Sequence, residues 1–195
     1  MRARAYEMLI HLVNPNTTKS MTAKIGKAAE AVAAPGTKIW ATQPDMGPVS
    51  IEGYYDEAFA VPGMLVRIRE AELQSIAGHV IACFDDTGLD AARSLAEAPV
   101  IGIGEAAFHA ATFISGKFSV VTTLSRSIPA IEYNLIRYGL ITRCTKVRAA
   151  EVPVLSLEEP NSPARVRISQ EIEKAKTEDR CDAVVLGCAG MADLA

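Results

Sequence analysis

The chain has 195 residues, of which 49% are hydrophobic, and a formal net charge of −3. This length is sufficient for one large domain or for two smaller lobes that each bury a core. The nearly balanced charge gives no indication of a nucleic-acid partner, and no apolar run reaches the ~18 residues that a membrane span requires. The first residues lack a long apolar segment and a small-residue cleavage site, so we expect no signal peptide and a cytoplasmic protein.

Short apolar runs alternate along the chain with stretches of helical periodicity. The apolar runs predict strands at residues 8–13, 37–42, 79–84, 99–103, 117–123, 144–154 and 182–188. The periodic stretches predict helices from about residue 19 to Pro35 and at residues 55–75, 89–98, 104–114, 126–139 and 161–176. Strands that alternate with helices are typical of an α/β protein with mostly parallel sheets.

The first predicted helix shows this periodicity clearly. Its apolar positions are spaced by three and four residues: Met21, Ile25, Ala28 and Val32. Pro35 and Gly36 are expected to end the helix. The segment 43–53, which is rich in glycine and proline, is expected to be a long polar loop.

The two halves of the chain resemble each other. Each half has a strand that leads into hydroxyl or amide residues, and a later strand that leads into a cysteine. We therefore predict two pseudo-symmetric α/β lobes, at residues 1–98 and 99–195, with an active site in the cleft between them. The alternative is that short apolar motifs recur by chance in any α/β chain.

Cysteine and histidine are the residues whose chemistry needs explanation. The chain contains Cys83, Cys144, Cys181 and Cys188, and also His11, His79 and His109. The cysteines are expected to be reduced, since the cytosol is reducing. No two cysteines have the C-x-x-C spacing and the histidines stand singly, so the sequence predicts no metal site. We interpret the single histidines as packing or surface residues.

Cys83 and Cys188 each stand where a predicted strand ends and a helix is expected to begin. Ligands of open parallel sheets bind outside the carboxyl ends of the strands. The first turn of a helix favours an anionic thiolate, and a thiol with a pKa of about 8.5 can act as a base or as an acid. Across one cleft, one thiol would take a proton from a carbon while the other delivers one to the opposite face. This arrangement predicts stereoinversion without a cofactor.

Burial in a core is the simpler explanation for any single cysteine, because free cysteine is among the most buried residue types. We adopt that explanation for Cys144 and Cys181. The matched positions of Cys83 and Cys188 favour the catalytic interpretation for that pair.

Six motifs connect these residues to a known family. They are "NPNTT" (14–18), "GPVSIEGYYDEAFAVPG" (47–63), "ACFDDTGLDAAR" (82–93), "VIGIGEAAFHAA" (100–111), "FSVVTTLSRSIP" (118–129) and "VLGCAGMADLA" (185–195). Over essentially its whole length the chain resembles the hydantoin racemase branch of the aspartate/glutamate racemase superfamily. The resemblance implies a two-thiol racemase that needs no cofactor and acts on 5-monosubstituted hydantoins or on allantoin. It also implies a homo-oligomer.

Other branches of the superfamily fit less well. Arylmalonate decarboxylases keep only the second cysteine, so the presence of Cys83 argues against them. Amino-acid racemases typically have Thr or Asn directly after the cysteine, where it holds a substrate carboxylate. Phe84 and Ala189 occupy those positions here, which suits a neutral ring.

Removal of the C5 proton of a hydantoin produces an enolate-like oxyanion, which hydrogen-bond donors would stabilise. We expect the substrate to contact residues near the strand ends: Asn14, Asn16, Thr17, Ser50, Phe84, Asp85, Thr122, Thr123, Gly187, Ala189 and Gly190. For Asn14, Asn16 and Thr17 an equally good interpretation is a turn followed by a helix cap. For Asp85 and Asp86 we favour a role as acids at a helix start.

The segment 102–107 permits a different interpretation, which we do not adopt. "GIGEAA" (102–107) fits a dinucleotide-binding turn, but no ribose-binding acid ends the next strand, so we favour a tight turn near the cleft. A small-molecule binding module without turnover is the alternative from another functional class.

The family resemblance implies one more strand and helix after Ala195, and we therefore expect the sheet of the first lobe to be one element short.

Overall fold

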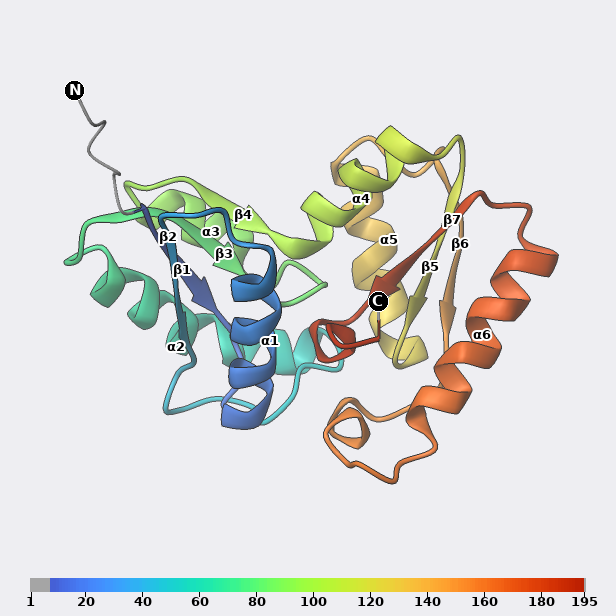
Figure 1. The fold of residues 1–195 in the computed structure, drawn as a ribbon, viewed down its shortest axis with the longest axis horizontal. Helices are drawn as coiled ribbons and strands as arrows, with labels where there is room; N and C mark the ends of the chain where they lie inside the picture. Colours follow the sequence, from blue (N-terminus) through green and yellow to red (C-terminus); the bar gives the residue numbers. More distant parts are fainter. Residues whose placement is uncertain (1–7, 195) are drawn as a thin grey trace.

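A computed structural model describes residues 8–194 of the chain. Residues 1–7, with which the segment used to predict the absence of a signal peptide begins, lie outside the described residues, as does residue 195. The described chain forms two separate parallel sheets with helices around them (Figure 1). The predicted α/β class with two lobes is therefore confirmed. No described helix is both long and apolar enough to cross a membrane.

The two sheets share one strand order. The strands are β1 (Met8–Val13), β2 (Thr37–Thr42), β3 (Ile76–Ile81), β4 (Val100–Gly102), β5 (Phe118–Thr122), β6 (Cys144–Ala149) and β7 (Ala183–Gly187). The first sheet runs β2-β1-β3-β4 and the second runs β6-β5-β7, with every pair parallel. β1, β2 and β3 thus correspond to β5, β6 and β7, as the predicted pseudo-symmetry requires.

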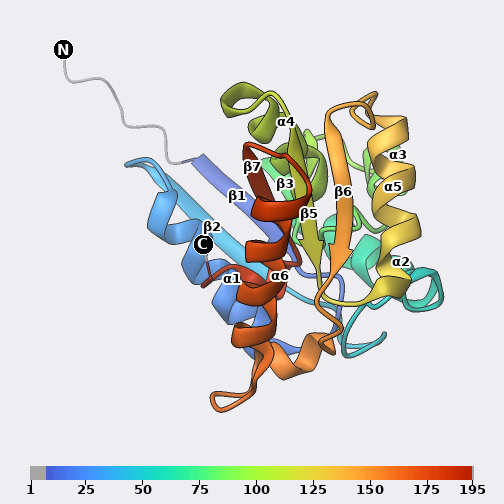
Figure 2. The same ribbon diagram turned by 90° about the vertical axis from the view of Figure 1, so that its right-hand side faces the viewer.

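Helices cover both faces of each sheet. They are α1 (Lys19–Val32), α2 (Tyr54–Ala71), α3 (Leu89–Leu95), α4 (Ile103–Ile114), α5 (Ile128–Arg137) and α6 (Ala164–Glu178). Three short 3₁₀ turns complete the described elements: η1 (Ser125–Ser127), η2 (Val154–Leu157) and η3 (Ala189–Met191). In the first lobe α1 covers one face, and α2 and α3 cover the other. In the second lobe α6 lies opposite α4 and α5 (Figures 1 and 2).

Three sequence-based boundaries need correction. The third strand ends at Ile81 rather than at residue 84, so Cys83 lies in the loop beyond it. Val32 is 86% exposed and does not join the apolar face of α1, because the helix already ends there. The predicted division between residues 98 and 99 places β4 in the second lobe, yet β4 pairs with β3 and belongs to the first sheet.

Apolar packing around each sheet forms the two cores. In the first lobe, Ile81 packs against Met64 and Ile68 of α2. In the second lobe, Phe108 of α4 stacks on Phe118 of β5, with ring centroids 6.0 Å apart. Burial of one such side chain contributes about 1.5–3 kcal/mol relative to exposure. These contacts fix the sheets and with them the strand ends that carry the cysteines.

Polar groups are also buried within the first lobe. His11 of β1 and His79 of β3 are adjacent in the sheet, with their Nδ1 atoms 2.8 Å apart. His11 Nε2 lies 2.7 Å from Thr42 Oγ1, and His79 Nε2 lies 2.7 Å from Glu72 Oε1. These two histidines form a pair, which corrects their interpretation as isolated residues.

A different polar cluster is buried in the second lobe. Arg148 of β6 makes two hydrogen bonds to Asp179, of 2.6 and 2.5 Å, and a further one of 2.9 Å to Glu171. Ser119 donates to the same Asp179 carboxylate at 2.9 Å. Burial is tolerated here because each charge has an opposite charge or a hydrogen bond.

Candidate active site

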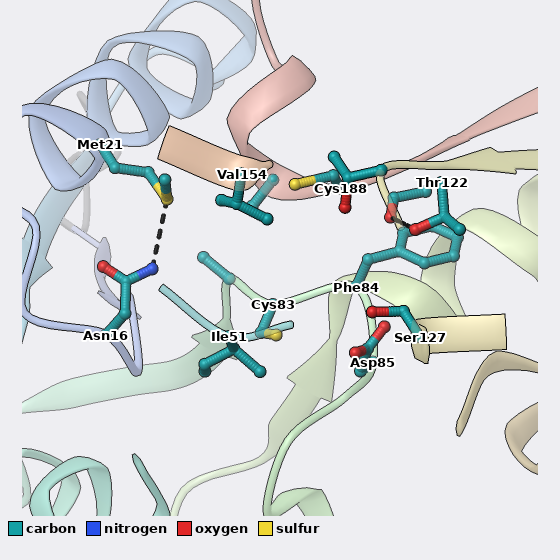
Figure 3. A pocket seen from close by; sticks show the side chains of 14 residues that line it. Asn16, Met21, Ile51, Cys83, Phe84, Asp85, Thr122, Ser127, Val154 and Cys188 are labelled. Carbon is teal, nitrogen blue, oxygen red and sulfur yellow. Dashed lines mark hydrogen bonds between the residues drawn. The ribbon is translucent and has the colours of Figure 1, made fainter. Parts of the chain in front are cut away.

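One pocket lies where the carboxyl ends of the two sheets face each other (Figure 3). Its lining comes from both lobes: Asn16, Met21, Ile51, Ala82, Cys83, Phe84, Asp85, Thr122, Thr123, Ser127, Val154, Gly187, Cys188 and Ala189. Cys83 and Cys188 lie on opposite sides of this pocket (Figure 3). The cavity volume is about 30 Å³, close to the space of one water molecule in the liquid. The pocket is therefore small in this structure.

Cys83 stands in a short segment that both lobes hold in place. The segment follows β3, and the Phe84 ring packs edge-on against Phe108 in the core of the second lobe, with centroids 5.2 Å apart. Asn134 of α5 donates to the Asp85 carbonyl oxygen at 2.7 Å. The Cys83 sulfur accepts hydrogen bonds from Thr87 Oγ1, at 3.2 Å, and from the Asp85 backbone N–H. These contacts fix the position of the thiol.

Cys188 follows β7 directly, and close backbone packing determines its position. Thr122 Oγ1 donates to the Gly187 carbonyl oxygen at 2.9 Å. The Gly190 backbone N–H donates to the Cys188 thiol. A Cβ at Gly190 would lie 2.9 Å from Leu157 Cδ1 and 3.5 Å from the Cys188 sulfur, so a larger residue would crowd the thiol. Each cysteine thus accepts a hydrogen bond from the amide two residues further along.

The electrostatic surroundings of the thiols differ from the sequence-based expectation. Burial, with the nearby Asp85 carboxyl adding to it, raises the pKa of Cys83 well above its ordinary value. Burial also raises the pKa of Cys188, to about 12, and Asp85 adds to this increase while Lys24 opposes it. The predicted stabilisation by a helix start is wrong for Cys83, because α3 begins only at Leu89. Burial therefore favours the neutral form of both thiols in the pocket.

Two adjacent acids near Cys83 have different surroundings. Asp86 accepts hydrogen bonds from the backbone N–H groups of Gly104, at 2.9 Å, and Glu105, at 2.7 Å, and so caps the start of α4. It is a helix-start acid as predicted, although for α4 rather than α3. Asp85 points into the pocket beside Ser127 (Figure 3). Burial and the charge of Glu57 raise the pKa of Asp85 to about 8.

The cap formed by Asp86 also explains the glycines of residues 102–107. A Cβ at Gly102 would lie 2.1 Å from Asp86 Oδ1, and one at Gly104 would lie 2.2 Å from the Phe84 carbonyl oxygen. Glycine at both positions lets α4 approach the segment that contains Cys83. This packing accounts for the G-x-G pattern without a dinucleotide.

Most of the residues predicted to contact substrate line the pocket. Those in the lining are Asn16, Phe84, Asp85, Thr122, Thr123, Gly187 and Ala189, together with both catalytic candidates. Asn14 is fully buried, donates to Asn16 Oδ1 at 2.9 Å and Thr22 Oγ1 at 3.0 Å, and accepts from the Asn16 backbone N–H, which supports the turn interpretation, while the start of α1 has no side-chain cap. Thr17 donates to the Pro48 carbonyl oxygen. Ser50 and Gly190 also lie outside the lining.

Sequence reasoning missed five lining residues: Met21, Ile51, Ala82, Ser127 and Val154. Ala82 directly precedes Cys83, and Ser127 follows Thr123 within one motif, so their proximity to the strand ends was the available signal. The other three reach the pocket only through the packing of α1, the loop 43–53 and η2. No pattern in the sequence indicates those contacts.

Two charged side chains connect the lobes beside the pocket. Glu52, in the loop before α2, accepts a hydrogen bond from the Val154 backbone N–H at 2.8 Å and forms an ion pair with Arg126. Lys24 of α1 pairs with Glu158 at 2.7 Å and donates to the Leu157 carbonyl oxygen at 3.2 Å. Ile51 and Val154, next to these contacts, line the pocket. The two contacts join the lobes beside the pocket.

No group of three or more His, Cys, Asp or Glu side chains in residues 8–194 is arranged to hold a metal ion.

Two lobes built on one strand order, with a cysteine from each at a shared pocket, define an enzyme of the racemase fold. The chain matches the family model described as Asp/Glu/hydantoin racemase over residues 10–195, and it belongs to this family. It is 52% identical to a hydantoin racemase of Rhizobium meliloti over 187 residues, which cover 96% of this chain and 78% of the relative.

Solved structures of allantoin racemases are also similar to this chain. The enzyme from Klebsiella pneumoniae is 48% identical, with a TM-score of 0.95 over 96% of this chain and 77% of the other. The enzyme from Pseudomonas fluorescens is 39% identical, with a TM-score of 0.91 over 96% of this chain and 79% of the other. The predicted family is thereby confirmed.

Proposed function

We propose that this protein inverts the C5 stereocentre of 5-monosubstituted hydantoins, with allantoin as the alternative substrate, by proton transfer between two thiols and the ring. The observation that supports this proposal best is the placement of Cys83 and Cys188 on opposite sides of one pocket (Figure 3). The naming of similar proteins as hydantoin or allantoin racemases agrees with it.

The lining of the pocket favours a neutral ring over a carboxylate. None of the described lining residues is basic, and the lining includes the carboxyl group of Asp85. A substrate carboxylate would have to leave water without gaining a cationic partner, which is costly. A hydantoin ring offers amide N–H and carbonyl groups instead, and these match the hydroxyls of Thr122, Thr123 and Ser127.

The reaction needs one thiolate and one thiol. The thiolate takes the C5 proton, so that the C–H bond breaks and an S–H bond forms, and the charge moves to the neighbouring ring oxygen. The opposite thiol then gives its proton to the other face of C5. Hydrogen bonds from the amides of Asp85 and Gly190 stabilise the thiolate form of Cys83 and Cys188, respectively.

Replacement of each thiol by serine tests this function. Cys83→Ser and Cys188→Ser should each lower racemisation of an enantiopure hydantoin by about 10²–10⁴-fold, the range for loss of a general acid or base. In deuterium oxide each variant should still exchange the C5 proton of one enantiomer, and the two variants should prefer opposite enantiomers. Polarimetry and mass spectrometry measure the two effects.

Cys144→Ser is the matched control, because Cys144 is half-buried in β6 and lies outside the pocket lining. It should racemise at the rate of the unsubstituted protein. Unchanged racemisation by Cys83→Ser would contradict the two-thiol scheme. Tight binding of hydantoin and allantoin in calorimetry without any change in optical rotation would identify a binding module instead.

Two further expectations stay predictions: assembly into a homo-oligomer and a cytoplasmic location. Light scattering addresses the first and cell fractionation the second.

A further inference from the structure

A second cavity, of about 170 Å³, lies beside the active-site pocket. It is lined by Tyr54, Glu57, Asp85, Asp86, Gly88, Leu89, Asp90, Ala91, Ala130, Tyr133, Asn134 and Arg137. Tyr54 and Tyr133 are 55% and 56% exposed, so the cavity reaches the protein surface. In the part of the chain that the structure describes, Asp85 is the one residue that lines both this cavity and the pocket.

Asp85 and Glu57 give the second cavity an unusual chemistry. The Glu57 Oε1 atom is buried and has no hydrogen-bond partner among the described residues. Burial, together with the charge of Asp56, raises the pKa of Glu57 to about 7, while that of Asp85 is raised to about 8. Carboxyl groups with pKa values near neutrality can both accept and release protons at physiological pH.

The other polar groups around Asp85 and Glu57 have separate partners. Asp86 is held by the start of α4 and by the Tyr138 hydroxyl, at 2.8 Å. Asp90 forms an ion pair with Arg137 at 2.9 Å. Asp85 and Glu57 are therefore the two acids of the cavity that neither a cation nor a helix start holds in one protonation state.

A two-thiol racemase must move a proton after every turnover. Once the product leaves, the thiol that received the C5 proton is protonated and the opposite one is a thiolate. This form binds the product enantiomer, not the substrate. One proton must therefore leave the first sulfur and one must reach the second before the same direction can repeat.

We infer that Asp85 and Glu57 form the route by which the protons of the two thiols are exchanged between turnovers. Asp85 accepts a proton as the S–H bond of one cysteine breaks, and it passes the proton to the other thiolate or to Glu57 and the water of the second cavity. The same path in reverse returns a proton from solvent, so charge and atoms balance. Asp85 lies close enough to both thiols for its charge to raise the pKa of each, and this position suits it to exchange protons with both. The inference rests on the proposed racemase function.

Replacement of Asp85 by asparagine tests the route. Asp85→Asn keeps the size of the side chain and removes its ability to carry a proton. At low substrate concentration the free enzyme has time to exchange protons before it meets substrate, so kcat/KM should change only through the lost effect of Asp85 on the thiol pKa values, and by less than kcat. At saturation the exchange should limit turnover, and kcat should fall by roughly 10²-fold, a typical effect of a lost proton-transfer group.

Three comparisons complete the experiment. Glu57→Gln should lower kcat in the same selective way but less, because Asp85 can still transfer protons between the thiols. Asp90→Asn, with its exposed and ion-paired carboxylate, is the control and should leave both constants unchanged. Imidazole buffer should restore kcat of Asp85→Asn and leave the unsubstituted protein unaffected, since a small acid can replace the missing carrier. Circular dichroism verifies folding, and Glu57→Gln provides the test if Asp85→Asn does not fold.

Equal loss of kcat and kcat/KM in Asp85→Asn, without rescue by imidazole, would show a structural role and overturn the inference. Normal kcat in both variants would also overturn it, and the proposed racemase function would stand. Absence of racemisation by the unsubstituted protein would overturn both proposals.

Discussion

Cys83 and Cys188 follow the corresponding strands β3 and β7, and each sulfur accepts a hydrogen bond from the amide two residues further along. Their side-chain surroundings are different. Cys83 has the Thr87 hydroxyl at 3.2 Å and the acids Asp85 and Glu57 nearby. Cys188 is affected by Lys24, which lowers its pKa and partly offsets the burial and the acids.

The polar side chains buried inside the two lobes also differ. The first sheet buries the adjacent side chains of His11 and His79, whereas the second buries Arg148 with Asp179. The repeated fold therefore determines where the thiols stand. Side chains that have no counterpart in the other lobe determine how each thiol ionises. Enantiomers have equal free energies, so this difference can alter the rate and affinity for each enantiomer but not their final ratio.

The largest expected effect concerns the buried ions of the second lobe. Arg148→Met should lower the free energy of unfolding by about 3–5 kcal/mol, because it leaves the Asp179 carboxylate buried without its cation. Urea unfolding followed by circular dichroism measures the change. Arg165→Met, at an exposed ion pair, should cost less than about 1 kcal/mol. Similar losses in both variants would contradict this account of the cluster.

The contribution of His11 to the stability of the first lobe should be lost in milder acid than that of Asp179 to the second. Burial and the neighbouring His79 lower the pKa of His11 to about 4. Between pH 6.5 and 4 the unfolded chain therefore binds a proton at this residue that the folded protein excludes, and the contribution of His11 to stability should fall by up to about 3 kcal/mol. Asp85 and Glu57, whose pKa values are raised, bind protons in the folded state over the same range and act in the opposite direction.

Substitution of His11 separates its effect from that of other groups. His11→Gln should lower the slope of the unfolding free energy against pH between 6.5 and 4 by up to about 1.4 kcal/mol per pH unit. Asp179, whose pKa Arg148 lowers, contributes stability that is lost only below about pH 4. An unchanged slope in the glutamine variant would contradict the assignment to His11.

A smaller effect is expected at Cys83. Thr87→Val removes the hydroxyl hydrogen bond to the sulfur, which is worth about 0.5–1.5 kcal/mol. Alkylation of Cys83 at fixed pH should slow by a factor of about two to ten, with Cys188 unaffected. Mass spectrometry of alkylated peptides measures both sites, and Thr87→Ser keeps the hydroxyl as a control. Equal slowing at both cysteines would show that the two surroundings are not independent.

The smallest effect should appear at Cys188. Lys24→Met removes the cation that lowers the pKa of this thiol. Because a partly exposed ion pair is worth about 0.2–1 kcal/mol, alkylation of Cys188 should slow by no more than about fivefold. Lys27→Met, on the exposed side of the same helix, is the matched control. Faster alkylation in the Lys24 variant would instead indicate that the loss of the Glu158 contact opens the pocket.

Much of the fold and both cysteine positions could be predicted from the sequence. The alternation of strand and helix patterns was sufficient, because parallel strands place their carboxyl ends at one edge of a sheet. The placement of β4 was not predictable in this way, since a strand of three residues has too little pattern to choose between two sheets. The adjacency of His11 and His79 also required the strand order.

The ionisation of the site was the part that sequence reasoning predicted wrongly. A cysteine before a helix suggests a stabilised thiolate, but the structure buries the sulfur of Cys83 and brings Asp85 close to it. Burial of this kind depends on how Phe84 packs into the other lobe, and therefore on contacts between residues distant in the chain. Ile51 and Val154 were not predicted to line the pocket, because their positions also depend on contacts between residues distant in the chain.

Glu52 has one carboxyl group, and its two oxygens hold two separate segments of the second lobe, at Val154 and at Arg126. Loss of this one carboxylate would remove both contacts at once, so two segments of the second lobe depend on the same residue of the first lobe for their position beside the pocket.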